Sequence, residues 1–146
     1  MRTTELVAEL GARLGIELRL NDEGTCRVSF DNDDVDFELS GEALYIMADI
    51  APATGREDAY GRLLKANWLG AESGGASIGL DAGRDVFALY AVERGDVAYE
   101  AFEARLVLFL KALRYWKEWL ALQSSSPVLQ APEEDFPVGT AGMLRI

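Results

Sequence analysis

The spacing of apolar residues changes along this chain, and the change limits the folds open to it. In residues 3–14, apolar side chains recur every three or four positions, as on one side of a helix. From residue 16 to residue 50 they alternate with polar ones, in runs separated by short polar turns. Such alternation predicts three or four strands of an antiparallel sheet, with one face buried and the other in water.

The helical and the alternating patterns both return later in the chain. Residues 56–71 predict a second helix, and residues 77–80 and 85–93 predict two strands joined by a tight turn. Residues 97–123 predict a long third helix. Segregated strands and helices are typical of an α+β fold, in which helices pack on an antiparallel sheet. The predicted order is α-β-β-β-α-β-β-α, with residues 16–20 as a possible further strand in the first group.

The chain of 146 residues suits one domain followed by a tail. We assign residues 1–123 to the domain, because Ser124-Ser125-Ser126-Pro127 marks the end of its periodic sequence. Residues 124–146 contain three prolines and little periodicity, and they predict a flexible C-terminal tail.

Few residues suited to catalysis are available. The chain has no histidine, the commonest general base, and Cys26 is its only cysteine. A single thiol can form neither an intrachain disulfide nor a structural zinc site, and its alternation with Val28 and Phe30 predicts a buried side chain. We therefore predict a protein that is not an enzyme and that has no catalytic residues, metal site or cofactor.

Two motifs resemble ligand sites and fail on their spacing. The acidic run 31–36 resembles a calcium loop, but Val35 stands at a ligand position and Asp36 where a glycine is needed. Gly74 and Gly75 follow a helix and lack the lysine of a phosphate-binding loop. We interpret the acidic run as a solvated turn and the glycines as a chain reversal between helix and strand.

The charge of the chain restricts its partners. Twenty-five acidic and fourteen basic residues give a formal net charge of −11, which repels nucleic acids and anionic lipids and favours basic partners. The longest nearly apolar run, residues 101–113, is broken by three charges, and no apolar leader precedes Glu5. We expect a cytoplasmic protein that binds no nucleic acid and does not insert into a membrane.

Apolar residues exceed what so small a domain is expected to bury, which predicts a protein interface. The excess includes Trp68 on the second helix and four residues beside the core stripe of the last helix: Val107, Leu108, Tyr115 and Trp119. Asn67 interrupts the apolar stripe of the second helix, and two interpretations stay open. It is either a polar side chain satisfied locally at a helix end, or a contact that fixes the register of a helix–helix interface.

Residues 64–81, with the sequence LKANWLGAESGGASIGLD, resemble the middle of the class I type III secretion chaperones, the group related to the Tir chaperone. The shared pattern is a helix with Leu-x-x-Asn, a loop with glycines and a strand with alternating apolar residues. Residues 85–90 resemble the strand that follows, and residues 14–16 resemble the opening of the family. The resemblance covers residues 3–122 and does not account for the tail.

The resemblance implies a homodimer that binds the N-terminal segment of a secreted effector and keeps it partly unfolded, soluble and competent for secretion. It also implies a dimer interface on the second helix and the next strand, formed by Leu64, Asn67, Trp68, Ile78 and Leu80. The effector-binding patches implied on the first helix and the first strands have these candidate residues: Val28, Phe30, Val35, Phe37, Leu44 and Ile46.

Two other functions stay open at this point. One is that of a related dimeric α+β module with a sensory or protein-interaction role and no secreted client. The other is that of a small enzyme that uses surface carboxylates or a metal ion.

Overall fold

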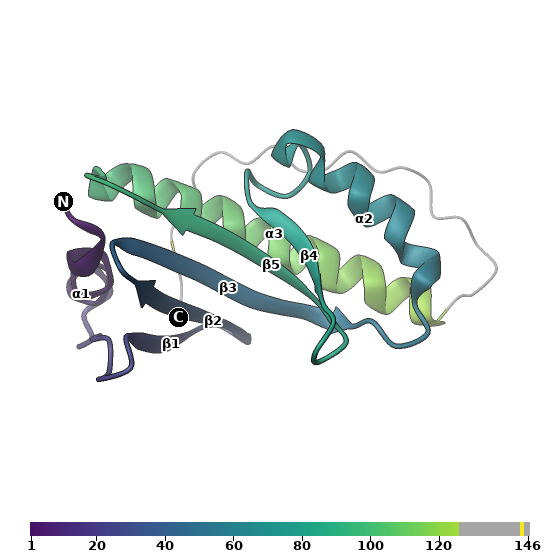
Figure 1. Cartoon of the computed structure of the whole chain (residues 1–146), viewed down its shortest axis with the longest axis horizontal. Coiled ribbons are helices and arrows are strands. Elements are labelled where there is room, and N and C mark those ends of the chain that lie inside the picture. The colour runs from purple at the N-terminus through teal and green to yellow at the C-terminus, as the bar shows by residue number, and fades with distance from the viewer. Residues whose placement is uncertain (126–143, 145–146) are drawn as a thin grey trace.

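The computed structural model describes residues 1–125 and Leu144. In chain order its elements are α1 (Thr3–Leu14), β1 (Thr25–Phe30), β2 (Asp33–Ser40), β3 (Ala43–Pro52), η1 (Glu57–Ala59), α2 (Tyr60–Asn67), η2 (Trp68–Gly70), β4 (Ser77–Asp81), β5 (Val86–Glu93) and α3 (Tyr99–Ser125). The predicted α+β class and the order of helices and strands are confirmed (Figure 1). The predicted flexible tail lies almost entirely outside the described residues and stays a prediction.

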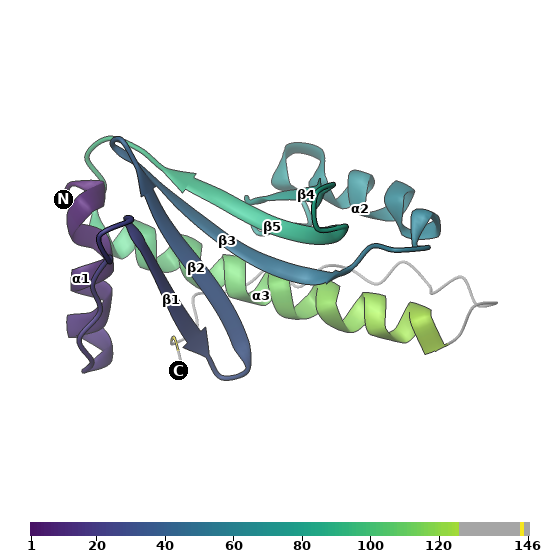
Figure 2. The same ribbon diagram turned by 60° about the horizontal axis from the view of Figure 1, so that its bottom comes forward.

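The five strands form one antiparallel sheet in the order β1-β2-β3-β5-β4. The long central strand β3 pairs with β2 on one side and with β5 on the other. Helix α3 runs across one face of this sheet, α1 lies at the β1–β2 end, and α2 lies beside β4 at the opposite end (Figures 1 and 2). The two ends of the sheet are therefore covered by different helices.

The segment 16–20 does not form the fourth strand that its alternation allowed. It follows α1 without strand pairing and packs back onto that helix, where a Cβ atom on Gly11 would lie 2.8 Å from the Ile16 carbonyl oxygen. The Asn21 side chain then turns the chain toward β1, because its Oδ1 atom accepts hydrogen bonds from the N–H groups of Glu23 and Thr25. The lack of a side chain at Gly11 thus favours packing against the helix over pairing with the sheet.

The core lies between α3 and the face of the sheet that α3 covers. Its largest fully buried side chains come from both layers: Phe30, Phe37, Leu44, Ile46, Leu89, Phe102, Leu106, Phe109, Leu113 and Trp116. Trp116 is fully buried, and its Nε1–H donates to the Glu72 carbonyl oxygen at 2.7 Å. The inner sheet face and the stripe of α3 thus form one continuous apolar layer.

Of the acidic run 31–36, only Asp31 and Asn32 form the turn between β1 and β2, whereas residues 33–36 begin β2. The prediction that the run is a solvated turn is wrong for Asp33. That residue is 8% exposed, and its carboxylate accepts hydrogen bonds from Arg114 Nε at 2.8 Å and Lys117 Nζ at 3.0 Å. Burial acts to raise the pKa of Asp33, but the hydrogen bonds from these two cations outweigh it and hold the pKa below its ordinary value. The ion cluster ties the β1–β2 hairpin to α3.

Candidate functional site

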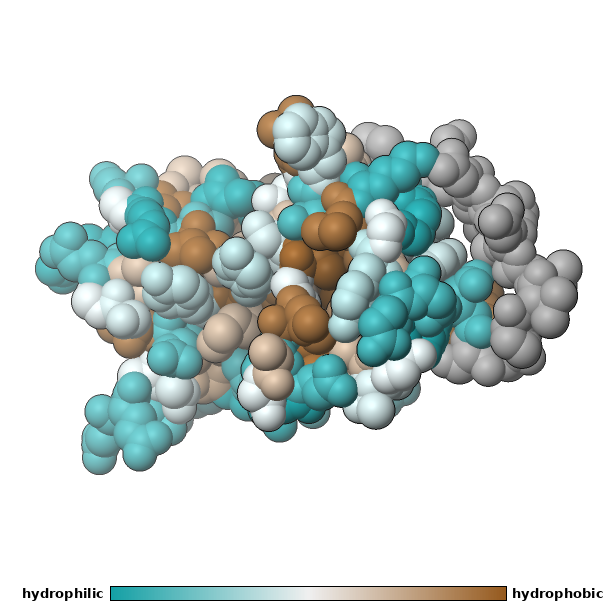
Figure 3. All heavy atoms as spheres, turned by 45° about the vertical axis from the view of Figure 1, so that its right-hand side comes forward, coloured by the Kyte–Doolittle hydropathy of each residue, from teal (hydrophilic) through white to brown (hydrophobic). Residues whose placement is uncertain are grey.

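Five large apolar side chains are exposed around α2, η2 and the β4–β5 pair, and we call this surface the α2–β4 face. Its residues are Leu64, Trp68, Leu69, Leu80 and Tyr90, with exposed fractions of 68%, 73%, 86%, 44% and 42%. Figure 3 shows apolar surface gathered between polar margins on this side of the molecule. A cluster of this kind on a highly charged protein is typical of sites of protein–protein interaction.

A shallow apolar cavity of ≈ 200 Å³ opens within the α2–β4 face. Its lining consists of Tyr60, Leu63, Leu64, Ile78, Gly79, Leu80 and Phe87. The rings of Tyr60 and Phe87 meet edge to face with their centroids 5.9 Å apart. The lining contains no carboxylate, amine, guanidinium or thiol, so the cavity suits an apolar side chain and not a reacting group.

The inner side of α2 is fixed firmly to α3. Arg62 forms two parallel hydrogen bonds to the Glu72 carboxylate, at 2.8 and 2.9 Å, and its guanidinium lies 4.9 Å from the centre of the Trp116 ring. The hydrogen bonds from Arg62 hold the pKa of Glu72 below its ordinary value. Because these contacts occupy the inner side of α2, Leu64 and Trp68 are presented on its outer side.

The backbone that follows α2 is strained at Leu69, and the side chains of Trp68 and Leu69 are both exposed there. Leu69 has φ 56° and ψ 20°, a left-handed conformation that costs roughly 1–2 kcal/mol for a residue with a side chain. The loop is also tight, because a Cβ atom on Gly74 would lie 2.5 Å from the Leu108 carbonyl oxygen of α3. Strain at an exposed apolar site is a recurrent feature of functional surfaces.

Asn67 joins α2 to β4 within the subunit. Its Oδ1 atom accepts a hydrogen bond from the Ile78 N–H at 2.8 Å, at the point where α2 ends and η2 begins. This contact supports the interpretation of Asn67 as a polar residue satisfied locally at a helix end. The structure therefore brings the five predicted dimer residues together, with three side chains exposed, Ile78 in the cavity wall and Asn67 at the helix–strand junction. Their contact with a second copy stays a prediction.

The six candidate effector-binding residues lie on the covered side of the sheet. Val28, Phe30, Val35, Phe37, Leu44 and Ile46 are each at most 3% exposed. Since α3 covers this face, the side chains of all six pack in the core of the subunit. Their prediction concerns a complex with a client, and a client that reached β1–β3 would first meet the outer sheet face or the free edge of β1.

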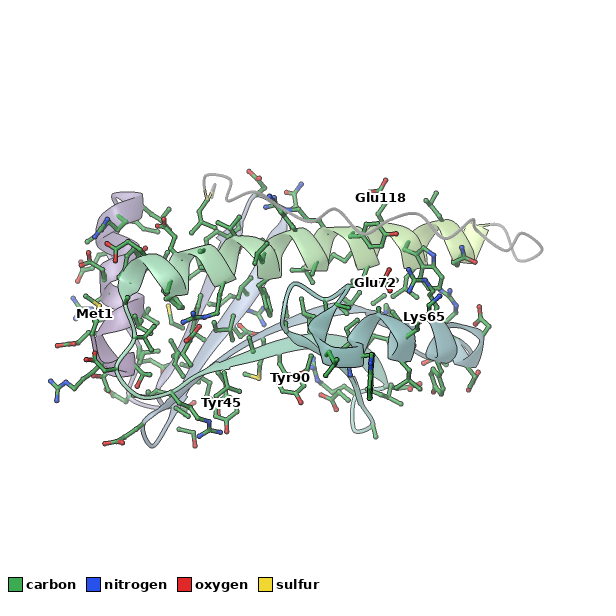
Figure 4. All side chains as sticks on the ribbon, turned by 90° about the horizontal axis from the view of Figure 1, so that it is seen from above. Met1, Tyr45, Lys65, Glu72, Tyr90 and Glu118 are labelled. Atoms are coloured by element: carbon green, nitrogen blue, oxygen red, sulfur yellow. The ribbon has the colours of Figure 1, made fainter. Side chains whose placement is uncertain are left out.

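The outer face of the sheet carries apolar residues that the sequence analysis did not select. Tyr45 and Tyr90 both project from the face opposite α3 (Figure 4), and Met47 is the register partner of Tyr90. The strand β5 is almost entirely apolar from Val86 to Val92, a pattern typical of strands that are covered on both faces. That pattern was the available signal for a second apolar face.

The predicted apolar excess on α3 is mostly used within the subunit. Val107 is buried, and Leu108, Tyr115 and Trp119 are half-buried. Trp119 meets Trp116 edge to face at 5.6 Å, and Tyr115 does so at 4.9 Å. Among the large apolar side chains of α3 that the structure describes, Leu122 alone is exposed, so most of the exposed apolar surface lies on the α2–β4 face.

Groups suited to chemistry are sparse in the described part of the chain. Within it, no cluster of acidic residues and cysteine is arranged to hold a metal ion. Cys26 is half-buried and not fully buried as predicted, and this burial raises the pKa of its thiol. Among the helices that the structure describes, none has the length and apolar character required to cross a bilayer.

Comparison with known proteins finds a matching family model, that of the Tir chaperone protein (CesT) family, over residues 5–117. A chain of the ExsC–ExsE complex is similar in structure, with a TM-score of 0.67 and 27% identity over 82% of this chain and 97% of that chain. A chain of the HopA1–SchA chaperone–effector complex has a TM-score of 0.65 and 22% identity, over 77% of this chain and 91% of that one.

A third similar structure is that of the Yersinia pestis type III secretion chaperone SycH in complex with a stable fragment of YscM2. It has a TM-score of 0.61 and 20% identity, over 77% of this chain and 98% of that chain. The two structures below 25% identity support the fold alone. The comparison with curated protein sequences finds no match.

Proposed function

This chain belongs to the Tir chaperone protein (CesT) family, and we propose that it binds the N-terminal segment of a secreted effector in the cytoplasm and keeps it partly unfolded until secretion. The family match carries the chaperone role. The similar structure at 27% identity, that of the ExsC–ExsE complex, contains two different proteins bound to each other and supports a protein client. The lining of the cavity on the α2–β4 face agrees with a role in binding protein, because most of its side chains are apolar.

The second part of the proposal is a homodimer that forms through the α2–β4 face. Leu64, Trp68 and Leu80 of one copy then cover the same residues of the other, with Asn67 and Ile78 shaping the contact from within each subunit. Such a self-complementary contact is the commonest form of symmetric dimer. Covering Trp68 alone removes on the order of 150 Å² of apolar surface from water, worth about 3–4 kcal/mol before the costs of association.

The third part of the proposal places the client at the opposite end of the sheet. The strand β1 is outermost in the sheet that the structure describes, and the segment before it occupies that edge only at its start, where the Asn21 N–H donates to the Thr25 carbonyl oxygen. The remainder of this edge can pair with an extended segment. A groove lined in part by Ala8, Ala12 and Ile16 runs beside α1 and offers apolar contact. The six buried candidates, from Val28 to Ile46, then act as the packed support under these strands.

Holding a client in this way requires no turnover of a bound nucleotide. Ordering an extended segment costs roughly 1–2 kcal/mol per residue, which apolar burial at about 25 cal/mol per Å² has to offset. A dimer offers two such surfaces to one client chain, and the second contact forms within an already bound complex. The affinity for the client thus comes from the apolar area that binding buries and from the linkage of two binding surfaces in one dimer.

The test is limited proteolysis of a client that co-purifies with this chain and is identified by mass spectrometry. We expect its N-terminal region alone to become protease-resistant when the purified chain is added, with no ATP present. A requirement for ATP, or protection of a folded domain elsewhere in the client, would contradict the proposal. As a control, the melting temperature with and without calcium or magnesium tests the metal-dependent enzyme, for which we expect no shift.

A further inference from the structure

The α2–β4 face carries both an exposed indole ring and a cavity, and the two lie next to each other. Trp68 is 73% exposed where η2 begins, and it is not among the residues that line the cavity. One residue earlier, the Asn67 Oδ1 atom accepts the hydrogen bond from the N–H of Ile78, which is part of the cavity wall. The indole therefore stands at the margin of the cavity of its own subunit and does not fill it.

The size and chemistry of the cavity suit an indole ring. An apolar cavity of about 150 Å³ can hold a benzene molecule. The cavity on the α2–β4 face measures ≈ 200 Å³ and opens to the surface. Tyr60 is the only lining residue with a polar side-chain atom, and a buried indole N–H usually has an acceptor such as a hydroxyl oxygen. The neighbouring Leu69 side chain has no group that could use this hydroxyl, so Trp68 suits the cavity better.

The position of the indole relative to the cavity is set by the structure around it. Trp68 has an extended conformation, with φ −60° and ψ 114°, and Leu69 follows in the left-handed region, so the chain leaves the axis of α2 directly after Asn67. Behind α2, the paired hydrogen bonds from Arg62 to Glu72 hold the helix against the subunit. Because little of this surface has to be ordered on binding, the entropic cost of a contact is low.

A projecting ring beside a cavity that can hold it is a self-complementary surface. A two-fold symmetric contact places this surface against its own copy, so the ring and the cavity of each subunit can be matched at once. We propose that the Trp68 indole of each copy enters the cavity between α2 and β4 of the other, and that this exchange selects a second copy of this chain as the partner. The proposal rests on the proposed dimer and names the contact that makes it specific. A chain with a small side chain in place of Trp68, or with a filled cavity, pairs poorly with this one.

The exchange is tested by mixing two full-length variants that each lose one half of the contact. Trp68→Ala removes the ring and leaves the cavity open, whereas Leu80→Trp keeps Trp68 and places a larger side chain over the cavity, at a site that is 44% exposed. We expect each variant alone to dimerise at least about tenfold more weakly than the unchanged chain in sedimentation experiments. In an equimolar mixture we expect heterodimers about tenfold tighter than either homodimer, because Trp68 of one copy enters the open cavity of the other.

Native mass spectrometry of the mixture separates the heterodimer from both homodimers by mass. The matched control is Leu122→Trp, which adds an indole at a 59% exposed site of α3, outside the α2–β4 face. This control should dimerise like the unchanged chain, and its heterodimers with Trp68→Ala should be weaker than its own homodimers. Heterodimers of Trp68→Ala and Leu80→Trp that are no tighter than the two homodimers overturn the exchange. The same result would follow if the two Trp68 rings stacked on each other at the symmetry axis.

Further outcomes separate the exchange from the dimer on which it rests. If the unchanged chain is a monomer, or if Trp68→Ala dimerises as tightly as the unchanged chain, the proposed dimer through this face fails and the exchange fails with it. If Trp68→Ala weakens the dimer and the mixture shows no rescue, the dimer stands and the exchange alone is overturned. Circular dichroism in dilute solution checks that each variant is folded. Leu64→Trp, at a 68% exposed site of the cavity lining, replaces Leu80→Trp if that variant is not.

Discussion

Around β1 and β2, large apolar side chains such as Phe30 and Phe37 are fully covered by α3, whereas around α2 and β4 Trp68 and Leu69 are left in water. The first region is closed further by the ion cluster of Asp33 with α3. The second region is equally well anchored, through Arg62 and Glu72, but its anchors hold apolar groups outward. Similar side chains thus stabilise the subunit at one end of the sheet and stay exposed at the other, where we propose a dimer contact.

The largest expected effect is a loss of stability in the first region, where α3 covers the apolar side chains of β1 and β2. Phe37→Ala removes a fully buried ring from the inner sheet face and should lower the free energy of unfolding by about 3–5 kcal/mol. Urea unfolding monitored by tryptophan fluorescence measures the loss. Leu80→Ala, at a half-exposed site on the other end of the sheet, is the matched control and should change the stability of a dilute subunit by less than about 1 kcal/mol. Equal losses would remove the distinction between the two regions.

The next largest effect is on the affinity of the proposed dimer, through the second region, where the apolar side chains of the α2–β4 face are exposed. Trp68→Glu puts a charge on the α2–β4 face and should weaken the proposed dimer by at least about 100-fold, because the lost apolar burial is worth about 3–4 kcal/mol. Sedimentation velocity over a range of concentrations measures the change. The control is Leu122→Glu, which is also exposed but lies outside this face. A folded dimer of unchanged affinity would take Trp68 out of the interface.

A smaller effect concerns the ion cluster that closes the first region. Asp33→Asn leaves two cations without their buried carboxylate and should cost about 1–2 kcal/mol at pH 7, since Arg114 is half-exposed and keeps part of its hydration. The folded-state pKa of Asp33 is lowered, so its contribution is complete above the ordinary pKa of 3.8 and is lost as the pH falls through the folded value.

The pH dependence separates this cluster from the other acidic groups. Between pH 7 and pH 5 the stability difference between the unchanged chain and Asp33→Asn should stay constant, and below about pH 4 it should shrink. Urea midpoints measured at several pH values test this. A difference that grew on acidification would show that the carboxylate is not the stabilising partner.

The smallest expected effect concerns Leu69, whose replacement should act in opposite directions on the stability of the subunit and on the proposed dimer. Leu69→Gly removes the cost of a left-handed conformation and should raise the stability of the dilute subunit by up to about 1 kcal/mol. The same change removes an exposed apolar side chain and should weaken the proposed dimer. Thermal unfolding at low concentration and sedimentation at high concentration measure the two quantities. A loss in both would mean that Leu69 supports the subunit itself.

Structural features that depend on neighbouring residues could be predicted from the sequence. Features that depend on packing between residues far apart in the chain could not. Alternation within β2 predicted that Val35 and Phe37 share a face, because strand geometry is local. Which face α3 covers depends on packing between residues more than 50 positions apart, since α3 begins at Tyr99 and the effector candidates end at Ile46, and these candidates all lie on the covered side. The segment 16–20 shows the same limit, since its alternation matches a strand but its contact with Gly11 of α1 decides its path.

The five dimer candidates lie together at one place in the structure, whereas the six effector candidates lie in the core. Both sets of contacts stay predictions. The helix stripe and the alternating strand both passed through residues 64–80, so the local patterns converged there. Leu69 was missed because it lies in the loop between them, where no periodic pattern applies. Tyr90 was missed because a strand with apolar residues on both faces does not reveal which of them is open.

Because α3 is the last described helix in the chain, the inner face of the sheet can be covered only late in synthesis. The meander β1–β3 forms from neighbours in the sequence and can pair early, but its cover begins only at Tyr99. At 5–20 residues per second, the ribosome needs about 4–15 s to make the chain from the end of β3 to the end of α3. Nascent chains stalled before and after residue 125 should therefore differ sharply in protease sensitivity within β1–β3. A member of a chaperone family thus passes through a stage of its own synthesis in which the apolar inner face of its sheet is exposed.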